Sequence, residues 1–461
     1  MIGPIKESDI RQKSDIHHNG GFILKRTAAF IIAAFSILAL LSGCATEPGN
    51  TPSSSAGDAI SRYDAVITEH YSFASFDDFD SYLDKYISSV TGGRENYMVS
   101  PLSFKYALAL LTAGAEGETK AELLSALGMR SEEDLTRQLV AFSEFSKKYD
   151  EDLETEVEQF RKSKAAGYYP KDAKEPFRAL RVANSVWRST ELVPVDFKAS
   201  YSEKISRDYS SEFFKFTSDD VIDRVNSWAN KKTEGMIPRL LSDDFDTSNL
   251  AVILMNALYF KDGWKKGFSS TDRIDSFTAF DGTKTEKDFI TSTQEVLWYK
   301  SGDTELVSVP MAGGISMLFV LGDGDGAFDM LKKAEKADVE ITIPEIEIES
   351  SFTNGEFMGF LKSAGVNLVF DPAGADLSGM FDPEKLDFSL YVSDIIQKTK
   401  LKLDKDGVEA AAVTALMLGK GGVSPSFDEK VSFTADRPFA FFIFAESNGE
   451  NIVLFEGRVV K

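Results

Sequence analysis

A stretch of small side chains near the end of the chain, residues 402–414, constrains the fold more than any other part of the sequence. It reads Lys-Leu-Asp-Lys-Asp-Gly-Val-Glu-Ala-Ala-Ala-Val-Thr. Its first residues alternate as in a β-strand, the pattern breaks at Gly407, and the next seven residues lack the aliphatic periodicity of a buried helix. A Gly-rich polar run, 419–427, follows before dense β-pattern resumes. The sequence therefore predicts a strand that leads into an exposed loop, which begins with side chains small enough for a tight space.

The composition indicates one or more compact domains and argues against a nucleic-acid partner. Of the 461 residues, 43% are hydrophobic and 36 are phenylalanine, which is enough for a full core with extensive aromatic packing. The formal net charge is −22, and a surface of that sign repels a phosphate backbone. We therefore expect no nucleic-acid binding.

The N-terminal region has the pattern of an export signal. Lys25 and Arg26 precede a 15-residue, mostly apolar segment, 27–41, which is too short for a comfortable membrane span. It ends in Leu-Ser-Gly-Cys, which resembles the bacterial lipoprotein box, where the chain is cut before a cysteine that receives a lipid. We expect residues 1–43 to be a signal peptide, Cys44 to anchor the protein to the bacterial cell envelope or cell surface, and 44–65 to be a flexible linker. The alternative is an ordinary signal peptide with an incidental cysteine.

Cys44 is the only cysteine in the chain, so no internal disulfide can form.

Between 131 and 178 the sequence is strongly charged, and we expect a solvated insertion with helices near 132–149 and 151–164 and no chemistry of its own. The nearly unbroken hydrophobic run 250–260 predicts a buried strand. No repeat of about 20 to 50 residues is visible, which excludes solenoids and propellers.

The residues of catalytic and metal sites are scarce. The three histidines are His17, His18 and His70, and the first two lie before the expected cleavage. A Ser-His-Asp or Cys-His site would need His70 as its base, far from any nucleophile motif. Zinc sites need clustered His and Cys, and no calcium loop or phosphate loop is present. We expect no enzyme activity, no metal and no cofactor, and the absence of catalytic residues favours a binding or inhibitory role.

Several motifs, taken together and in order, resemble those of the serpin family. The resemblance covers about 72–461, and its motifs are Asn96-Tyr-Met-Val-Ser-Pro-Leu-Ser103, Gly114-Ala-Glu-Gly-Glu-Thr119, Asn226-Ser-Trp-Ala with Thr233-Glu-Gly-Met-Ile237, Asn256-Ala-Leu-Tyr-Phe-Lys-Asp-Gly-Trp264, Ala375-Asp-Leu-Ser-Gly379, Asp436-Arg-Pro-Phe439 and Leu454-Phe-Glu-Gly457. The fourth is close to the family pattern Asn-Ala-x-Tyr-Phe-Lys-Gly-x-Trp. The resemblance implies an α+β serpin fold over 66–461, with a large central mixed β-sheet, additional sheets, about eight to nine helices and an exposed reactive-centre loop at about 407–427.

By the same resemblance, the chain would inhibit serine proteases, with cysteine proteases as the alternative class, by a suicide-substrate mechanism. A protease cuts the exposed loop and becomes acylated, and the freed loop inserts into the central sheet. The hinge of the loop would be Gly407, Val408, Glu409, Ala410, Ala411, Ala412, Val413 and Thr414. Alternation of a strand would then point Val408, Ala410, Ala412 and Thr414 into the core and Glu409 outward. The alternative function is a non-inhibitory surface binding or adhesion lipoprotein with the serpin fold.

Further site residues follow from the resemblance alone. The region through which the sheet opens would include Ser100, Ser103 and Asn256, with Gln397 as their hydrogen-bond partner in the position where many serpins carry a histidine. Trp264 would lie near the entry point of the loop. Without the family, these would be ordinary buried polar and aromatic residues. A second departure is Lys405, which replaces the usual hinge glutamate.

The scissile bond is placed by family spacing about fourteen residues after Gly407. We predict Lys420–Gly421, since a lysine suits a trypsin-like primary pocket, with Leu418 and Gly421 as the alternative positions before the cut. The expected partners are therefore a trypsin-like serine protease, held in a covalent complex, and a membrane, reached through the lipid on Cys44. We expect the protein to be a monomer.

Overall fold

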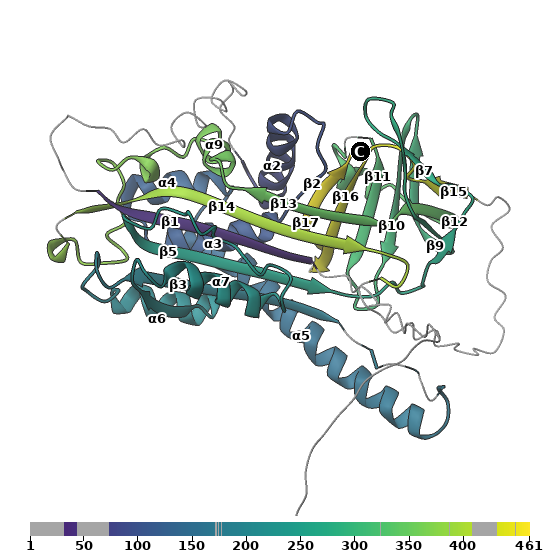
Figure 1. The fold of residues 1–461 in the computed structure, drawn as a ribbon, viewed down its shortest axis with the longest axis horizontal. Coiled ribbons are helices and arrows are strands. Elements are labelled where there is room, and N and C mark those ends of the chain that lie inside the picture. Colours follow the sequence, from purple (N-terminus) through teal and green to yellow (C-terminus); the bar gives the residue numbers. More distant parts are fainter. Residues whose placement is uncertain are drawn as a thin grey trace, which may run out of the picture.

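The structure is a computed structural model. It describes residues 32–43, of which only the backbone is considered, and residues 73–461 except 171, 172, 174, 177, 323, 387, 408–430 and 448. The described helices and strands combine into an α+β fold in which long sheets carry most of the core (Figure 1). This confirms the predicted fold class, and the described part holds eight α-helices, α2 to α9.

The helices lie mainly in the first half of the chain. Their bounds are α2 (Phe76–Val90), α3 (Pro101–Gly114), α4 (Gly117–Ala126), α5 (Glu132–Ala165), α6 (Ala199–Tyr209), α7 (Val221–Lys232), α8 (Ala327–Leu331) and α9 (Glu356–Ser363), with two short 3-10 helices at Leu368–Phe370 and Pro383–Lys385.

The central sheet has six strands in the order β13-β14-β1-β5-β3-β4. Its strands are β1 (Ile32–Gly43), β3 (Ala179–Ser189), β4 (Glu212–Phe216), β5 (Leu250–Lys261), β13 (Ile346–Phe352) and β14 (Ser389–Leu403). The pair β3–β4 is parallel and the other pairs are antiparallel, so the sheet is mixed, as predicted. Every residue of β5 is buried, in agreement with its unbroken hydrophobic sequence.

A second sheet of nine strands completes the body. Its main order is β15-β12-β9-β10-β11-β16-β17-β2, with β6 paired to β9. The bounds are β2 (Tyr97–Val99), β6 (Ser269–Thr271), β9 (Phe289–Ser301), β10 (Thr304–Pro310), β11 (Ser316–Leu321), β12 (Glu335–Pro344), β15 (Val431–Thr434), β16 (Phe439–Ser447) and β17 (Glu450–Val459), while β7 (Ser276–Thr278) and β8 (Lys284–Glu286) form a separate hairpin.

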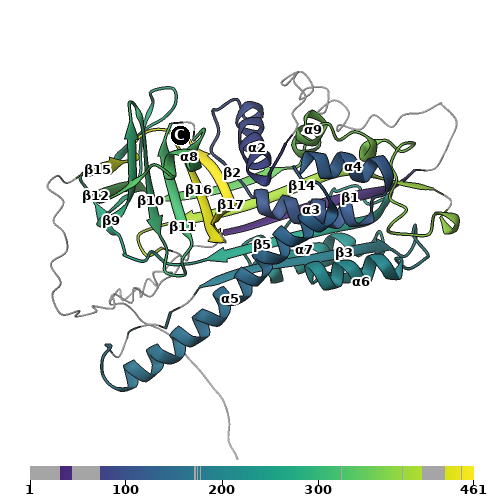
Figure 2. The same ribbon diagram turned by 180° about the vertical axis from the view of Figure 1, so that it is seen from behind.

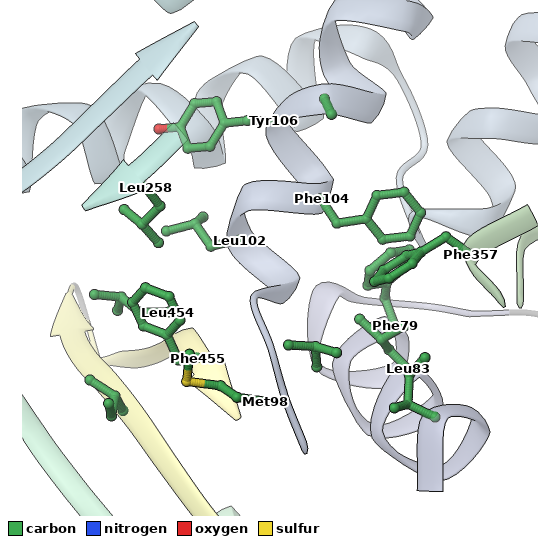
Figure 3. Close-up of a cluster of buried hydrophobic side chains, with 14 of the residues drawn as sticks. Phe79, Leu83, Met98, Leu102, Phe104, Tyr106, Leu258, Phe357, Leu454 and Phe455 are labelled. Carbon is green, nitrogen blue, oxygen red and sulfur yellow. The ribbon is translucent and has the colours of Figure 1, made fainter. Parts of the chain in front are cut away.

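Helix α3 lies at the centre of the core. Ser100 caps its N-terminus by accepting a hydrogen bond from the Ser103 N–H, and Pro101 occupies the first turn, where its missing N–H costs little. All fourteen residues of the helix are buried. Figure 3 shows its Leu102 and Phe104 among side chains from α2, α9, β5 and β17. The helix therefore joins the two sheets and gives the central sheet a rigid support on one face.

Helix α5 differs from the expectation for the charged segment 131–178. It is one continuous helix of 34 residues, and its first half is not solvated, because Leu135, Leu139, Phe142 and Tyr149 are buried. These residues recur at intervals of three, four and seven, which is the spacing of one helical face. The second half extends away from the body, as the view from behind shows best (Figure 2). The prediction of a solvated insertion was therefore wrong for the first half of the helix.

Strand β1 consists of residues that the sequence assigns to a signal peptide. It pairs antiparallel with both β14 and β5 along its whole length, from Ile32 opposite Phe260 to Gly43 opposite Ser389. Figure 1 shows it between these two long strands. In the part of the chain that the structure describes, no helix is long and apolar enough to cross a membrane.

Candidate functional site

The end of β14 forms a tight turn at the predicted hinge. The Gly407 N–H donates to the Asp404 carbonyl at 3.3 Å, the Asp406 N–H donates to the Asp404 carboxylate at 2.9 Å, and Asp404 and Gly407 form an antiparallel bridge. The chain therefore reverses its direction between Asp404 and Gly407. The other hinge residues, 408–414, and the predicted bond between Lys420 and Gly421 lie outside the described residues, as does Cys44.

Gly407 fits a place that no other residue could occupy without a shift. Its φ angle is +78°, and a Cβ atom on it would lie 2.4 Å from the backbone nitrogen of Trp264 and 2.6 Å from the Gly263 Cα. Both the backbone conformation and the close contact with another backbone require glycine. The turn is thus packed directly against the residues that follow β5.

Trp264 closes this contact from the side of β5. Its indole Nε1–H donates to the Asp404 carbonyl at 3.1 Å, and its ring packs against Phe268, with ring centres 5.1 Å apart. The Phe268 N–H donates to the Lys405 carbonyl at 3.2 Å, so the substituted hinge residue takes part through its backbone while its side chain is exposed. The structure thus brings Trp264 and Gly407 together at the C-terminal ends of β5 and β14.

Strand β1 lies between β5 and β14, antiparallel to both, so β5 and β14 run parallel to each other. We call the space between β5 and β14 the gap; it is the position that an inserted loop would need. A segment that continues from Gly407 and turns back along β14 would have the same orientation as β1. The turn and the gap therefore belong to one site.

Ser100, which caps α3, and Gln397 of β14 contact each other. The Ser100 N–H donates to Gln397 Oε1 at 2.9 Å, and Gln397 Nε2 donates back to the Ser100 carbonyl at 3.1 Å. The Ser100 hydroxyl donates to the Leu454 carbonyl at 2.7 Å. The side-chain amide donates and accepts at the same time, so Gln397 ties β14 to the start of α3.

Asn256 lies on the other side of β1 from Gln397. Both residues are opposite Ser36 in the strand register, one on each side of β1. The Asn256 amide donates to Asn184 Oδ1 at 2.9 Å, and Asn184 donates to the Tyr209 carbonyl at 2.9 Å. Asn184 was missed by the sequence reasoning, because a single asparagine within strand pattern gives no sign of a partner 72 residues away.

A second group of missed residues surrounds Asp262, which directly follows β5. Its carboxylate accepts hydrogen bonds from the Tyr149 hydroxyl at 2.6 Å, the Gly263 N–H at 2.7 Å and the Gly313 N–H at 2.8 Å. Burial raises the pKa of Asp262 to about 6, and these hydrogen bonds and the nearby Arg178 charge oppose the shift. Burial and the Asp262 charge together hold the pKa of the Tyr149 hydroxyl well above its usual value.

The shifted pKa predicts a pH dependence of stability. The ordinary pKa is 3.8, so the folded state holds the Asp262 proton more tightly than the unfolded state, and this contribution to stability is full below that value and is lost as the pH rises through about 6. Between about pH 4.5 and pH 7.5, Asp262 should cost about 2 kcal/mol of unfolding free energy. Urea unfolding at both pH values should show that Asp262→Asn reduces the pH dependence by this amount. An unchanged dependence would contradict the assignment.

Comparisons with known proteins identify the class of protein that this fold and turn define. A family model described as Serpin (serine protease inhibitor) matches residues 81–461. The chain therefore belongs to the serpin family.

The relatives that it resembles include protease inhibitors. Leukocyte elastase inhibitor A of Mus musculus is 30% identical over 399 residues, which cover 81% of this chain and 94% of that protein. Serpin B10 of Otolemur garnettii is 29% identical over 412 residues, covering 84% and 98%. Among solved structures, the thermophilic serpin tengpin in its native state aligns with a TM-score of 0.63 at 23% identity and covers 91% of this chain and 100% of its own, which supports the fold.

Proposed function

We propose that this serpin inhibits serine proteases, and as a second class cysteine proteases, as a suicide substrate, and that it is not itself an enzyme. The observation that carries the proposal is the turn between Asp404 and Gly407, which reverses the chain at the end of β14, the strand that borders the gap beside β5. The protease serine oxygen attacks the carbonyl carbon at the cut, an ester bond forms, and the amine of the departing chain leaves with the serine proton. Insertion of the freed loop then carries the acylated protease away before water can cleave the ester.

The length of the loop suits the gap. Strand β1, which fills the gap, has 12 residues, and the segment from Val408 to Lys420 is one residue longer. A loop cut after Lys420 is therefore long enough to replace β1 between β5 and β14, and each paired backbone group would add about 1 kcal/mol to the stability of the cleaved form. This gain is the driving force that inhibition requires.

We further propose that residues 1–43 are a leader that is removed on export, and that the mature chain, a monomer, is held at a bacterial cell envelope by a lipid on Cys44. Strand β1 ends at Gly43, the residue before the expected cut. A leader that is removed cannot remain in the sheet, so the strand would belong to the unprocessed chain, where its apolar sequence fills the gap between β5 and β14. Processing would then empty the gap for the reactive loop.

The proposal is tested with a chain that begins at residue 44. It should be incubated with trypsin, chymotrypsin, elastase and papain, and the products separated on a denaturing gel. At least one protease should form a covalent complex that survives SDS. The fraction of inhibitor cut without trapping should unfold at a higher temperature than the intact chain, because the loop has joined the sheet. If the loop is cut but neither result appears, the non-inhibitory alternative is correct.

The predicted cleavage site gives a separate prediction. Lys420→Ala should reduce the rate of complex formation with trypsin by at least about tenfold, since the primary pocket of trypsin loses its charged partner. Leu418→Ala is the control and should leave that rate nearly unchanged. Mass spectrometry of the peptide released from the cut chain would locate the bond directly, and a cut after Leu418 or Gly421 would replace the assignment to Lys420.

A further inference from the structure

Asp262, at the end of β5, and Tyr149, on helix α5, contact each other next to the Gly407 turn. Asp262 stands where the family pattern Asn-Ala-x-Tyr-Phe-Lys-Gly-x-Trp has a glycine. Tyr149 belongs to α5, within the charged segment 131–178, for which the sequence predicts no functional residues. The Tyr149 hydroxyl donates to the Asp262 carboxylate at 2.6 Å, although the two residues are 113 positions apart. Both side chains are buried.

The contact fixes the backbone on which the Gly407 turn rests. Asp262 Oδ1 accepts from the Gly263 N–H, and the Gly263 carbonyl accepts from the Ala312 N–H at 2.8 Å. Trp264 forms a bridge with Met311. Gly263 and Trp264 are also the residues that a Cβ atom on Gly407 would meet. The carboxylate therefore sets the position of the surface against which the hinge closes.

Gly313 joins the same arrangement from the opposite loop. Its N–H donates to Asp262 Oδ2 at 2.8 Å, and a Cβ atom on it would lie 2.3 Å from the Tyr149 ring. The ring thus fills the space that a side chain at 313 would need. Tyr149 and Asp262 hold the loop 311–313 and the end of β5 together.

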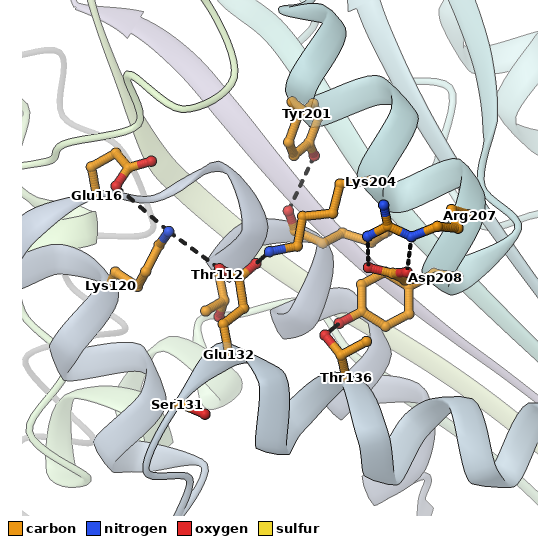
Figure 4. A network of polar contacts seen from close by, with 12 residues as sticks. Thr112, Glu116, Lys120, Ser131, Glu132, Thr136, Tyr201, Lys204, Arg207 and Asp208 are labelled. Carbon is orange, nitrogen blue, oxygen red and sulfur yellow. Dashed lines mark hydrogen bonds and ion pairs between the residues drawn. The ribbon is translucent and has the colours of Figure 1, made fainter.

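Helix α5 is anchored at both ends of its docked half, so Tyr149 has a defined position. At the helix start, Glu132 forms ion pairs with Lys120 of α4 at 3.3 Å and with Lys204 of α6 at 2.5 Å (Figure 4). Near Tyr149, the Arg178 guanidinium lies 4.9 Å from the tyrosine ring and also pairs with Glu156 at 2.7 Å. The helix is therefore held firmly where it presents Tyr149 to the end of β5.

We propose that Tyr149 and Asp262 form a positioning pair for loop insertion, which holds the end of β5 in place while the Gly407 turn separates from Trp264. The inference rests on the proposed function, because it concerns the insertion step. Loop residues must enter between β5 and β14 at this end of the sheet, and a displaced β5 end would slow the first pairing. Slower insertion gives water more time to release the protease, so more inhibitor is consumed as substrate.

The test compares Tyr149→Phe with Tyr201→Phe in the chain that begins at residue 44. Tyr201 is also buried, and its hydroxyl donates to the Leu110 carbonyl at 3.1 Å, within the body and away from the hinge. Both changes remove one buried hydroxyl. The measured quantities are the number of inhibitor molecules consumed per trypsin molecule trapped, with elastase in its place if the unsubstituted chain traps that enzyme instead, and the midpoint of urea unfolding.

Tyr149→Phe should raise the consumption per trapped protease at least threefold, whereas Tyr201→Phe should leave it unchanged at a similar loss of stability. Asp262→Ala, which removes the acceptor, should raise it as well, and the double variant should be no worse than the poorer single variant, because each change removes the contact between the two side chains. If Tyr149→Phe and Tyr201→Phe give equal consumption, the pair has no positioning role. If the unsubstituted chain traps no protease at all, the proposed function fails instead, so the two failures are distinguishable.

Discussion

Removal of residues 1–43 should convert the protein from a substrate of proteases into an inhibitor. In the full-length chain, β1 pairs with β14 and β5 over the whole gap, so a cleaved loop has no place to insert. The protease would cut the loop, the ester would hydrolyse, and active enzyme would be recovered. In the chain that begins at residue 44 no β1 strand separates β5 from β14, so the cleaved loop can take that place and pair with both strands. Trapping should therefore be at least about a hundredfold more efficient in the shorter chain, a difference of about 3 kcal/mol in the barrier to insertion relative to ester hydrolysis.

A matched variant of the full-length chain tests whether pairing of β1 in the sheet, and not the mere presence of residues 1–43, blocks insertion of the loop. Phe35 lies in the regular part of the β1 register, opposite Lys398 and Ala257. Phe35→Pro removes a backbone N–H and cannot be accommodated in a central strand, so β1 should leave the sheet. Trapping should then return although all 461 residues are present. The readouts are the covalent complex on a denaturing gel and the rise in unfolding temperature after loop cleavage. Equal trapping by the unsubstituted full-length and shortened chains would show that β1 does not block the gap.

The fold could be predicted from the sequence because its strongest signals are local or are carried by motifs. The hydrophobic run of β5 requires burial on both faces, and Gly407 breaks a strand pattern at a place where only glycine fits. The resemblance also named Ser100 and Gln397, and the structure places them in contact. In each case the residue type itself restricts the structure that can form around it.

The contacts around Asp262 could not be predicted, since they depend on how distant elements meet. By residue type, an aspartate is mostly exposed and a tyrosine is intermediate, so neither position predicts burial. Their burial is decided by the docking of α5, for which the spacing of Leu135, Leu139, Phe142 and Tyr149 was the available signal. Likewise, the apolar sequence of β1 (Ile32–Gly43) is compatible with both a signal peptide and a central strand, because each needs hydrophobic side chains and few charges. Periodicity alone does not separate the two.

The second large effect concerns the face of the loop that must enter the core. If the loop inserts as a strand, Ala412 points inward and Ala411 outward. Beneath the gap the side chains of β5 are buried throughout, and α3 packs there with no exposed residue. A glutamate at 412 would enter this region without a partner, at a cost of several kcal/mol. A cost of about 4 kcal/mol slows insertion by about a thousandfold, which leaves the acylated protease time to be released by water.

Ala412→Glu should therefore make the chain that begins at residue 44 a substrate, while Ala411→Glu should preserve trapping. The two variants carry the same exchange at adjacent positions, so net charge, loop length and distance from the cut are matched, and only the face of the strand differs. Thr414→Arg should act like Ala412→Glu, since it lies two residues further on the same face. Cleavage rate, complex yield and recovered protease activity are measured together. All variants should be cut at similar rates, because acylation precedes insertion. Stoichiometric trapping by Ala412→Glu would mean that this segment never enters the core, and insertion beside β14 would then have to be abandoned as the trapping step.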